Sequence, residues 1–150
     1  PAETPDEAYP FTLTTGRVLY QYHTGTMTHR SEGIMEYTPS DFVEIHPETA
    51  AEHGIESGDP VRVESERGAI TVPAQVTDRV GPDTVFAPIH FADSAVNRLT
   101  DEERLDPDAA TPEFKVSAVR IAPADDDSAA PTPTACETSP DDAGTSTGDD

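Results

Sequence analysis

The sequence predicts an all-β domain folded as a small barrel, and three observations lead to this prediction. Short runs rich in β-branched and aromatic residues recur along the chain. Turn-forming residues separate these runs at short intervals. Only two segments carry helical signals, and both are short. Six or seven short strands with two small helices favour a barrel over a parallel sheet covered by long crossover helices.

The first half of the folded region is expected to hold strands and one helix. PFTLTTGRVLYQY at 10–22 predicts one or two strands with a bend at Gly16. DFVEIHP at 41–47 predicts a strand that its final proline stops. The same proline suits a first helical turn, and Gly54 suits the left-handed residue after a last turn, so 47–53 is expected to be a short helix.

The second half is expected to hold four strands and a second helix. PVRVES at 60–65 and AITVPAQVT at 69–77 alternate around an ERG turn and predict a hairpin. VFAPIHF at 85–91 is continuously apolar, which indicates a strand buried on both faces. DSAVNRLT at 93–100 begins with an N-cap residue type and predicts a short helix. EFKVSAVRI at 113–121 predicts the last strand.

Both ends of the chain are predicted to lie outside the fold. From 122 to 150 there is no Val, Ile, Leu, Met or aromatic residue, and eight acids face no basic residue. Such a segment cannot bury enough apolar area to offset its ordering entropy, so we expect a disordered acidic tail. Residues 1–8 are expected to be a loose end or a linker, which leaves 9–121 as the folded domain. The first residue is not Met, which suggests a processed product or an excised piece.

The charge of the chain is extreme and lysine is almost absent. Thirty acids and nine basic residues give a formal net charge of −21, and Lys115 is the single lysine. Concentrated salt screens the self-repulsion of such a surface, which is typical of proteins from salt-loaded cells. An acidic surface for a cationic partner is the alternative. The charge disfavours nucleic-acid binding, and the chain has no membrane-length apolar run and no secretory signal, so we expect a soluble, cytoplasmic protein.

Common catalytic and metal-binding patterns are missing. The sequence has no HExxH, CxxC, GxSxG or P-loop motif. No two of its five histidines stand at i, i+4 on a helix, and His46 and His53 are expected at the surface. A single Cys136 can form neither an internal disulfide nor a multi-cysteine metal site. We therefore assign no catalytic residue and no metal ligand.

One segment stands apart from this acidic background. TGRVLYQYHTGTMTHR at 15–30 contains no acid but many hydroxyl, imidazole and guanidinium donors. Closely spaced Thr24, Thr26 and Thr28 are expected to converge with backbone amides on one anion, with Arg17 or Arg30 adding a charged fork. A carboxylate here would compete with a phosphate for the same donors. The alternative is an ordinary strand and loop with surface threonines.

The same segment resembles a known family. TGRVLYQYHTGTMTHR, the long run from FVEIHPETAAEHG to FAPIHF, AVNRLT and PEFKVSAVRI are together similar to the C-terminal domain of molybdopterin-dependent oxidoreductases. The resemblance covers about 10–121. It is greatest for formate dehydrogenase catalytic subunits, which HTGTMT and PEFKVSAVRI favour, and next for nitrate reductases. It implies a double-psi β-barrel that binds molybdopterin guanine dinucleotide, with Mo or W carried by the full-length enzyme.

The resemblance also implies a set of cofactor-binding residues. Thr28 lies beside this set, and His90 lies near a further family contact that varies among relatives. The implied contacts are Thr15, Gly16, Arg17, Tyr22, His23, Thr24, Thr26, Asn97 and Lys115.

Two of these residues have support of their own. A single lysine retained in a chain otherwise depleted of lysine suggests a specific ammonium role for Lys115, such as pairing with a phosphate. Asn97 offers two donors and an acceptor in fixed geometry, which suits the edge of a pterin or guanine. The simpler interpretations are a surface lysine and a helix-end asparagine.

The resemblance leaves the chemistry elsewhere. In the family, the metal-binding residue, the iron-sulfur cysteines and the proton-transferring groups belong to upstream domains that this sequence lacks. We therefore expect the partners to be the remaining domains of the same catalytic subunit, with electron-transfer subunits in addition. Other hypotheses are a nitrate reductase domain, a free-standing double-psi barrel that binds proteins as an adaptor, and an acidic protein without a ligand.

Overall fold

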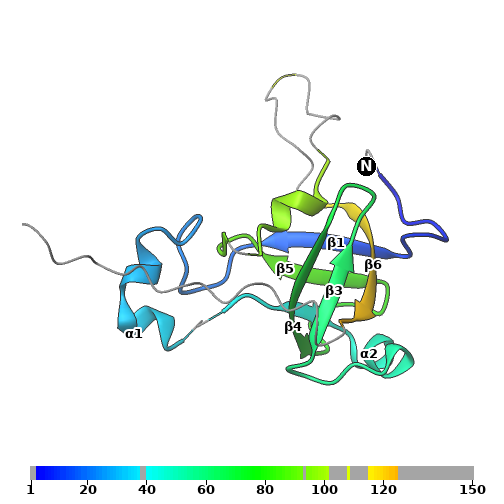
Figure 1. Ribbon diagram of the computed structural model, residues 1–150, viewed down its shortest axis with the longest axis horizontal. Coiled ribbons are helices and arrows are strands. Elements are labelled where there is room, and N and C mark those ends of the chain that lie inside the picture. The colour runs from blue at the N-terminus through cyan, green and yellow to red at the C-terminus, as the bar shows by residue number, and fades with distance from the viewer. Residues whose placement is uncertain (1–2, 38–39, 93, 102–107, 109–114, 125–150) are drawn as a thin grey trace, which may run out of the picture.

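The computed structural model describes residues 3–37, 40–92, 94–101, 108 and 115–124. In these parts a β-barrel forms the body of the molecule, and an arm with two short helices lies to one side of it (Figure 1). The predicted disordered tail from 125 onward, together with Cys136, falls outside the described residues.

Six strands in the described residues close into a barrel in the order β1-β5-β2-β4-β3-β6. Two pairs run parallel, β1 with β5 and β2 with β4, and the other four pairs are antiparallel. The predicted mainly-β barrel, which the double-psi family requires, is confirmed. The strands are β1 Phe11–Gly16, β2 Val43–Ile45, β3 Pro60–Glu64, β4 Ala69–Val76, β5 Thr84–Pro88 and β6 Ser117–Pro123.

Alternating side chains fill the barrel interior. In β1, buried residues alternate with half-buried ones, and Leu13 is fully buried. In β3, Val61 and Val63 are buried while their neighbours face outward, as period-two alternation requires. Burying a side chain of this size contributes roughly 1.5–3 kcal/mol, so the core adds substantially to the stability of a barrel whose neighbouring strands are hydrogen-bonded. The fully buried aliphatic residues are Leu13, Val43, Ile45, Val61, Val63, Val85, Leu99 and Val119.

The hairpin and the first predicted helix form where the sequence places them. Strands β3 and β4 pair antiparallel with Val61 opposite Val72. Helix α2 spans Pro47–His53, has Pro at its first turn, and ends at Gly54 with φ 65° and ψ 35°. His46 caps the helix with its side chain, since its Nδ1 accepts from the Glu48 N–H at 3.3 Å.

The sequence left one or two strands open for 10–22, with a bend at Gly16. The structure has one strand, 11–16, which ends at Gly16, and no second strand forms in 17–22. The chain turns because Val18 N–H donates to the His90 ring rather than to a neighbouring strand. The arm, defined as residues 17–37, then contains a 3-10 helix η1 Thr28–Arg30 and a helix α1 Glu32–Met35, neither of which was predicted.

The other boundaries shift by a few residues. Strand β5 ends at Pro88, before the predicted 91, and β6 runs from Ser117 to Pro123, two residues into the predicted tail. The predicted helix at 93–100 is a 3-10 helix, η2 Val96–Leu99, with Ala95 as an N-cap that makes no side-chain bond.

Part of the predicted loose N-terminal segment contacts the barrel. Of residues 1–8, the structure describes 3–8. The Glu3 carboxylate forms an ion pair with Arg67 at 3.0 Å, and Asp6 accepts the backbone N–H groups of Ala8 and Tyr9. Glu3 is therefore attached to the turn between β3 and β4.

Candidate functional site

A pocket of about 400 Å³ opens where β1 ends. Its wall combines the end of β1, the arm, the segment after β5, η2 and the residues before β6. Six of the nine predicted binding residues line it, and Ile89 is a lining residue that sequence reasoning missed. The lining residues are Thr15, Gly16, Arg17, Thr24, Ile89, Asn97 and Lys115.

Among the described residues, the lining of this pocket carries positive charge only. Arg17 and Lys115 are the charged members of that set, and none of its seven residues is acidic, although the chain has a net charge of −21. Lys115 Nζ donates to the Thr15 backbone oxygen at 2.5 Å. This bond fixes the ammonium at the end of β1 and leaves two of its three N–H donors for a ligand.

Gly16 lines the pocket at a position where a side chain would clash. A Cβ on Gly16 would come within 2.8 Å of the Phe86 ring and 3.7 Å of Lys115 Nζ. The Gly16 carbonyl accepts the Ile89 N–H at 3.0 Å, which ties β1 to the segment after β5. A bare backbone lets a ligand approach the chain closely.

Asn97 lines the pocket from η2, which packs against another part of the chain. The turn between β3 and β4 packs under η2, since a Cβ on Gly68 would meet the Arg98 oxygen at 3.1 Å. Arg67, in the same turn, donates to the Leu99 oxygen at 3.3 Å. The wall that carries Asn97 therefore has a fixed support.

The guanidinium of Arg67 is strongly paired. Burial alone would lower the pKa of Arg67, but its hydrogen bond to Glu3 and the charges of Glu3 and Asp101 outweigh burial and raise it above its usual value. Arg67 Nη2 lies 3.2 Å from Asp101 Oδ2. The cation stays protonated and links three separate parts of the chain.

Three predicted residues are not brought into the pocket lining. Tyr22 is 54% exposed and its ring meets the His23 ring edge-on at 4.3 Å. His23 is exposed and has a positive φ of 49°. Thr26 is exposed and its hydroxyl lies 3.3 Å from that of Thr24.

The predicted convergence of three threonine hydroxyls on one anion is not seen. Thr28 Oγ1 donates to the side chain of Gln21 at 2.5 Å, inside the arm. Thr24 alone of the three lines the pocket. Spacing in the sequence could not show this, because the turns of the arm direct Thr26 and Thr28 elsewhere.

His90 lies beside the pocket without lining it. Its side chain is fully buried, and both ring nitrogens meet backbone groups of the arm, Val18 N–H and the His23 oxygen. The ring is thus engaged with the chain itself, unlike the ligand contact that the resemblance had suggested nearby.

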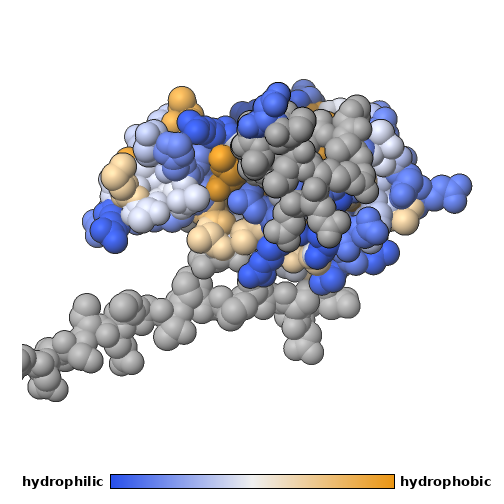
Figure 2. All heavy atoms as spheres, turned by 90° about the horizontal axis from the view of Figure 1, so that it is seen from above, coloured by the Kyte–Doolittle hydropathy of each residue, from blue (hydrophilic) through white to orange (hydrophobic). Residues whose placement is uncertain are grey.

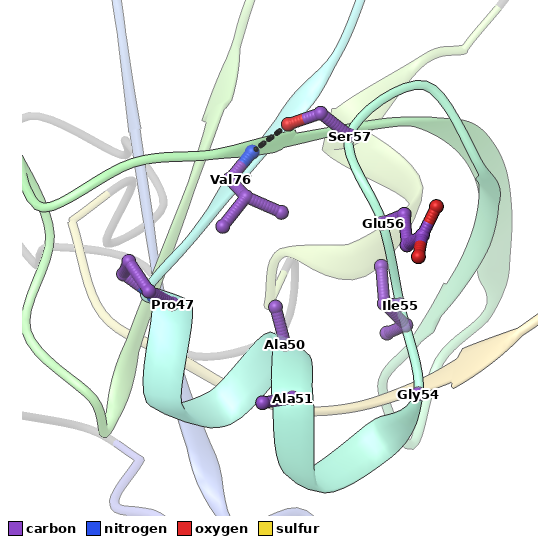
Figure 3. A pocket seen from close by; sticks show the side chains of 8 residues that line it. All are labelled: Pro47, Ala50, Ala51, Gly54, Ile55, Glu56, Ser57 and Val76. Carbon is purple, nitrogen blue, oxygen red and sulfur yellow. Dashed lines mark hydrogen bonds between the residues drawn. The ribbon is translucent and has the colours of Figure 1, made fainter.

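A second hollow lies beside α2 and has a different character. It measures about 500 Å³ and is lined mainly by apolar side chains of α2 and the loop after it, with Ser57 Oγ accepting from Val76 N–H at 2.9 Å (Figure 3). Its single charged lining residue is the acidic Glu56. It offers no cation to an anion and contains none of the predicted binding residues.

Two other kinds of feature are absent from the described residues. There, no three His, Cys, Asp or Glu side chains are grouped closely enough to hold a metal ion. Nor does any helix in those residues combine the length and apolarity needed to cross a bilayer.

Known proteins resemble this chain in sequence and in fold. The chain is 45% identical over 121 residues to the F420-dependent formate dehydrogenase 1 subunit alpha of Methanococcus maripaludis, covering 81% of this chain and 18% of that protein. It is 48% identical over 124 residues to the assimilatory nitrate reductase catalytic subunit of Bacillus subtilis, covering 82% and 17%. Acetylene hydratase from Pelobacter acetylenicus shares the fold, with a TM-score of 0.66 at 18% identity, over 77% of this chain and 18% of that one.

The chain thus spans less than a fifth of the length of these curated relatives. A family model described as "Molydopterin dinucleotide binding domain" matches residues 11–118, which include β1 to β5 and the first two residues of β6. With this match and these relatives, the chain belongs to the molybdopterin dinucleotide binding domain family.

Proposed function

We propose that the pocket at the end of β1 binds the dinucleotide part of molybdopterin guanine dinucleotide. The observation that carries the proposal is the pocket lining, whose described residues include two cations and no acid in a chain of net charge −21. A pyrophosphate is the part of the cofactor that such a lining suits, because carboxylates elsewhere on the surface repel it.

The donors present fit this group. Arg17 supplies a planar fork and Lys115 a point charge for phosphate oxygens. Asn97 supplies an amide that can pair with the edge of a guanine or pterin. Gly16 exposes backbone where any Cβ would collide with Phe86. The cofactor supplies the redox chemistry when bound, and these residues bind and orient it.

We propose that the complete protein is a formate dehydrogenase catalytic subunit that oxidises formate to CO2 with the transfer of two electrons. Support comes from two F420-dependent formate dehydrogenase alpha subunits, at 45% and 47% identity. A nitrate reductase is the second candidate, since the Bacillus subtilis enzyme is 48% identical. The metal ligand and proton-transfer groups would come from the parts of the relatives that this chain does not cover.

The surface of the arm supports docking to those remaining domains. The large hydrophobic residues of greatest exposure in the described residues all lie there, with Leu19 86%, Met27 68% and Tyr37 70% exposed. Tyr20 stacks on Tyr37 at 4.8 Å, and apolar atoms appear at the outer edge of the arm in Figure 2. The arm also buries the polar side chain of Gln21. A group of exposed large apolar residues is expected to be covered, and we propose that the rest of the catalytic subunit covers it; electron-transfer subunits are further proposed partners.

We also propose that the protein works in a cytoplasm rich in salt. Support comes from 30 acids against nine basic residues, of which one is lysine. Screening of these charges by salt reduces their mutual repulsion.

The experiment that tests the binding site uses the full-length enzyme. Lys115→Ala is compared with Lys115→Arg and with Arg120→Ala, which removes an exposed cation from β6 outside the pocket. Guanine dinucleotide and metal per polypeptide are measured after purification, together with formate oxidation and nitrate reduction. We expect a clear loss of cofactor for Lys115→Ala, partial retention for Lys115→Arg, and no loss for Arg120→Ala.

Two outcomes would change this account. Full cofactor content in the Lys115→Ala enzyme would contradict the assignment of the pocket. Nitrate reduction without formate oxidation by the unmodified enzyme would make nitrate, and not formate, the substrate. The assignment of the pocket would be unaffected.

A further inference from the structure

The fully buried imidazole of His90 is bonded to the arm at two points. His90 is 0% exposed and follows β5 by two residues. Val18 N–H donates to His90 Nε2 at 2.9 Å, and His90 Nδ1 lies within hydrogen-bonding distance of the His23 backbone oxygen.

These two bonds define the protonation of the ring. Nε2 accepts a hydrogen bond, so it carries no proton, and Nδ1 must carry the proton that it donates to the His23 carbonyl. The ring is therefore neutral, in the Nδ1–H tautomer. A doubly protonated ring would have two donors and could not accept from Val18.

The bonded backbone groups bracket one loop. Val18 and His23 enclose residues 19–22, and the residues immediately outside them, Arg17 and Thr24, both line the pocket. His23 has a φ of 49°, a left-handed conformation that is unfavourable for a residue other than glycine. A bond to its carbonyl helps to hold that conformation.

The segment that carries His90 is tied to the barrel by backbone hydrogen bonds. Ile89 N–H donates to the Gly16 oxygen at 3.0 Å, and β5 pairs with β1 along its length. The His90 ring therefore links the barrel to both ends of the loop at 19–22.

We propose that His90 is a positioning residue that fixes Arg17 and Thr24 at the mouth of the pocket. It acts through backbone hydrogen bonds and does not touch the ligand. The inference rests on the proposed function of the pocket and adds to it a residue whose loss weakens binding without removing any group from the lining.

Three variants of this chain test the inference, with guanosine 5′-diphosphate as the probe. His90→Leu removes both bonds, whereas His90→Gln keeps one acceptor and one donor in its amide. His53→Leu is the matched control, because His53 bonds to the Thr49 oxygen and packs on Phe11, at the opposite end of β1 from the pocket. Affinity is measured by calorimetry, and thermal unfolding is measured in parallel.

We expect His90→Leu to weaken the affinity by about tenfold or more, and His90→Gln to stay within about threefold of the unmodified chain. His53→Leu should lower the melting temperature without changing affinity. Equal affinity of His90→Leu and the unmodified chain, or equal losses in His90→Leu and His53→Leu, would overturn the inference.

Two measurements test the geometry without relying on the ligand. Nitrogen-15 NMR of the unmodified chain should show His90 protonated at Nδ1 alone, and Val18 N–H should exchange faster with solvent in His90→Leu. A ring protonated at Nε2, or unchanged exchange at Val18, would overturn the positioning role even if binding fails. Absence of any binding by the unmodified chain would instead overturn the proposed function of the pocket.

Discussion

Replacing Arg67 by Met tests how the turn between β3 and β4 supports the pocket wall. The substitution keeps most of the aliphatic stem and removes the guanidinium. That group donates to Glu3 at 3.0 Å, to Asp101 at 3.2 Å and to the Leu99 oxygen at 3.3 Å. All three contacts are lost together.

The expected loss in the free energy of unfolding lies between the values typical of exposed and of buried ion pairs. Removing one partner of a fully buried ion pair costs roughly 3–5 kcal/mol, whereas exposed pairs contribute about 0–1 kcal/mol. The side chains here are 20% exposed for Arg67 and 9% for Asp101, so the cluster is nearer the buried limit. We expect Arg67→Met to lower the free energy of unfolding by about 2–3 kcal/mol, which corresponds to a fall in melting temperature of about 10 °C.

Urea unfolding at constant ionic strength measures this change. Arg62→Met is the control, since Arg62 is 48% exposed and pairs with Glu64 on the barrel surface, so its loss should cost under about 1 kcal/mol. Similar small losses in the two variants would refute the reasoning, because burial would then not distinguish the two ion pairs.

Further predictions concern pH, backbone conformation and salt. Hydrogen bonds from Arg120 and then Arg62 lower the pKa of Glu64, so its contribution is present at neutral pH and is lost as the pH falls through that lowered value. The difference in melting temperature between Glu64→Gln and the unmodified chain should therefore shrink as the pH falls below the usual range of a glutamate carboxyl. Gly54→Ala, at φ 65°, should cost about 1 kcal/mol by urea unfolding, whereas Gly33→Ala, in α1 with open space around it, should cost nothing. Diluting salt should lower the melting temperature, and a salt-independent value would contradict the proposed salt-rich setting.

Local signals predicted the parts of the fold where local and tertiary preferences agree. The hairpin of β3 and β4 follows from alternation around a turn, and α2 follows from Pro47 and Gly54. The sequence left a second strand open after Gly16, and none forms there. His90, 72 positions from Val18, takes the N–H that a second strand would have used.

Six of the pocket-lining residues were named from the family resemblance, and residue type added support for Asn97 and Lys115. Gly16, Asn97 and Lys115 meet in one pocket although they come from β1, η2 and the residues before β6. The closely spaced threonines separate, because Thr28 bonds to Gln21 within the arm. Ile89 and the role of His90 had no sequence signal beyond an apolar strand, since both depend on how β5 meets β1.

The most direct test of the central claim is an amide chemical-shift map of this chain titrated with guanosine 5′-diphosphate and then with the isolated molybdopterin dinucleotide. Binding in the pocket at the end of β1 predicts shifts at Gly16, Arg17, Thr24, Asn97 and Lys115, with none around Glu56 and Ser57 in the hollow beside α2. Shifts confined to that hollow, or a complete absence of shifts, would contradict it.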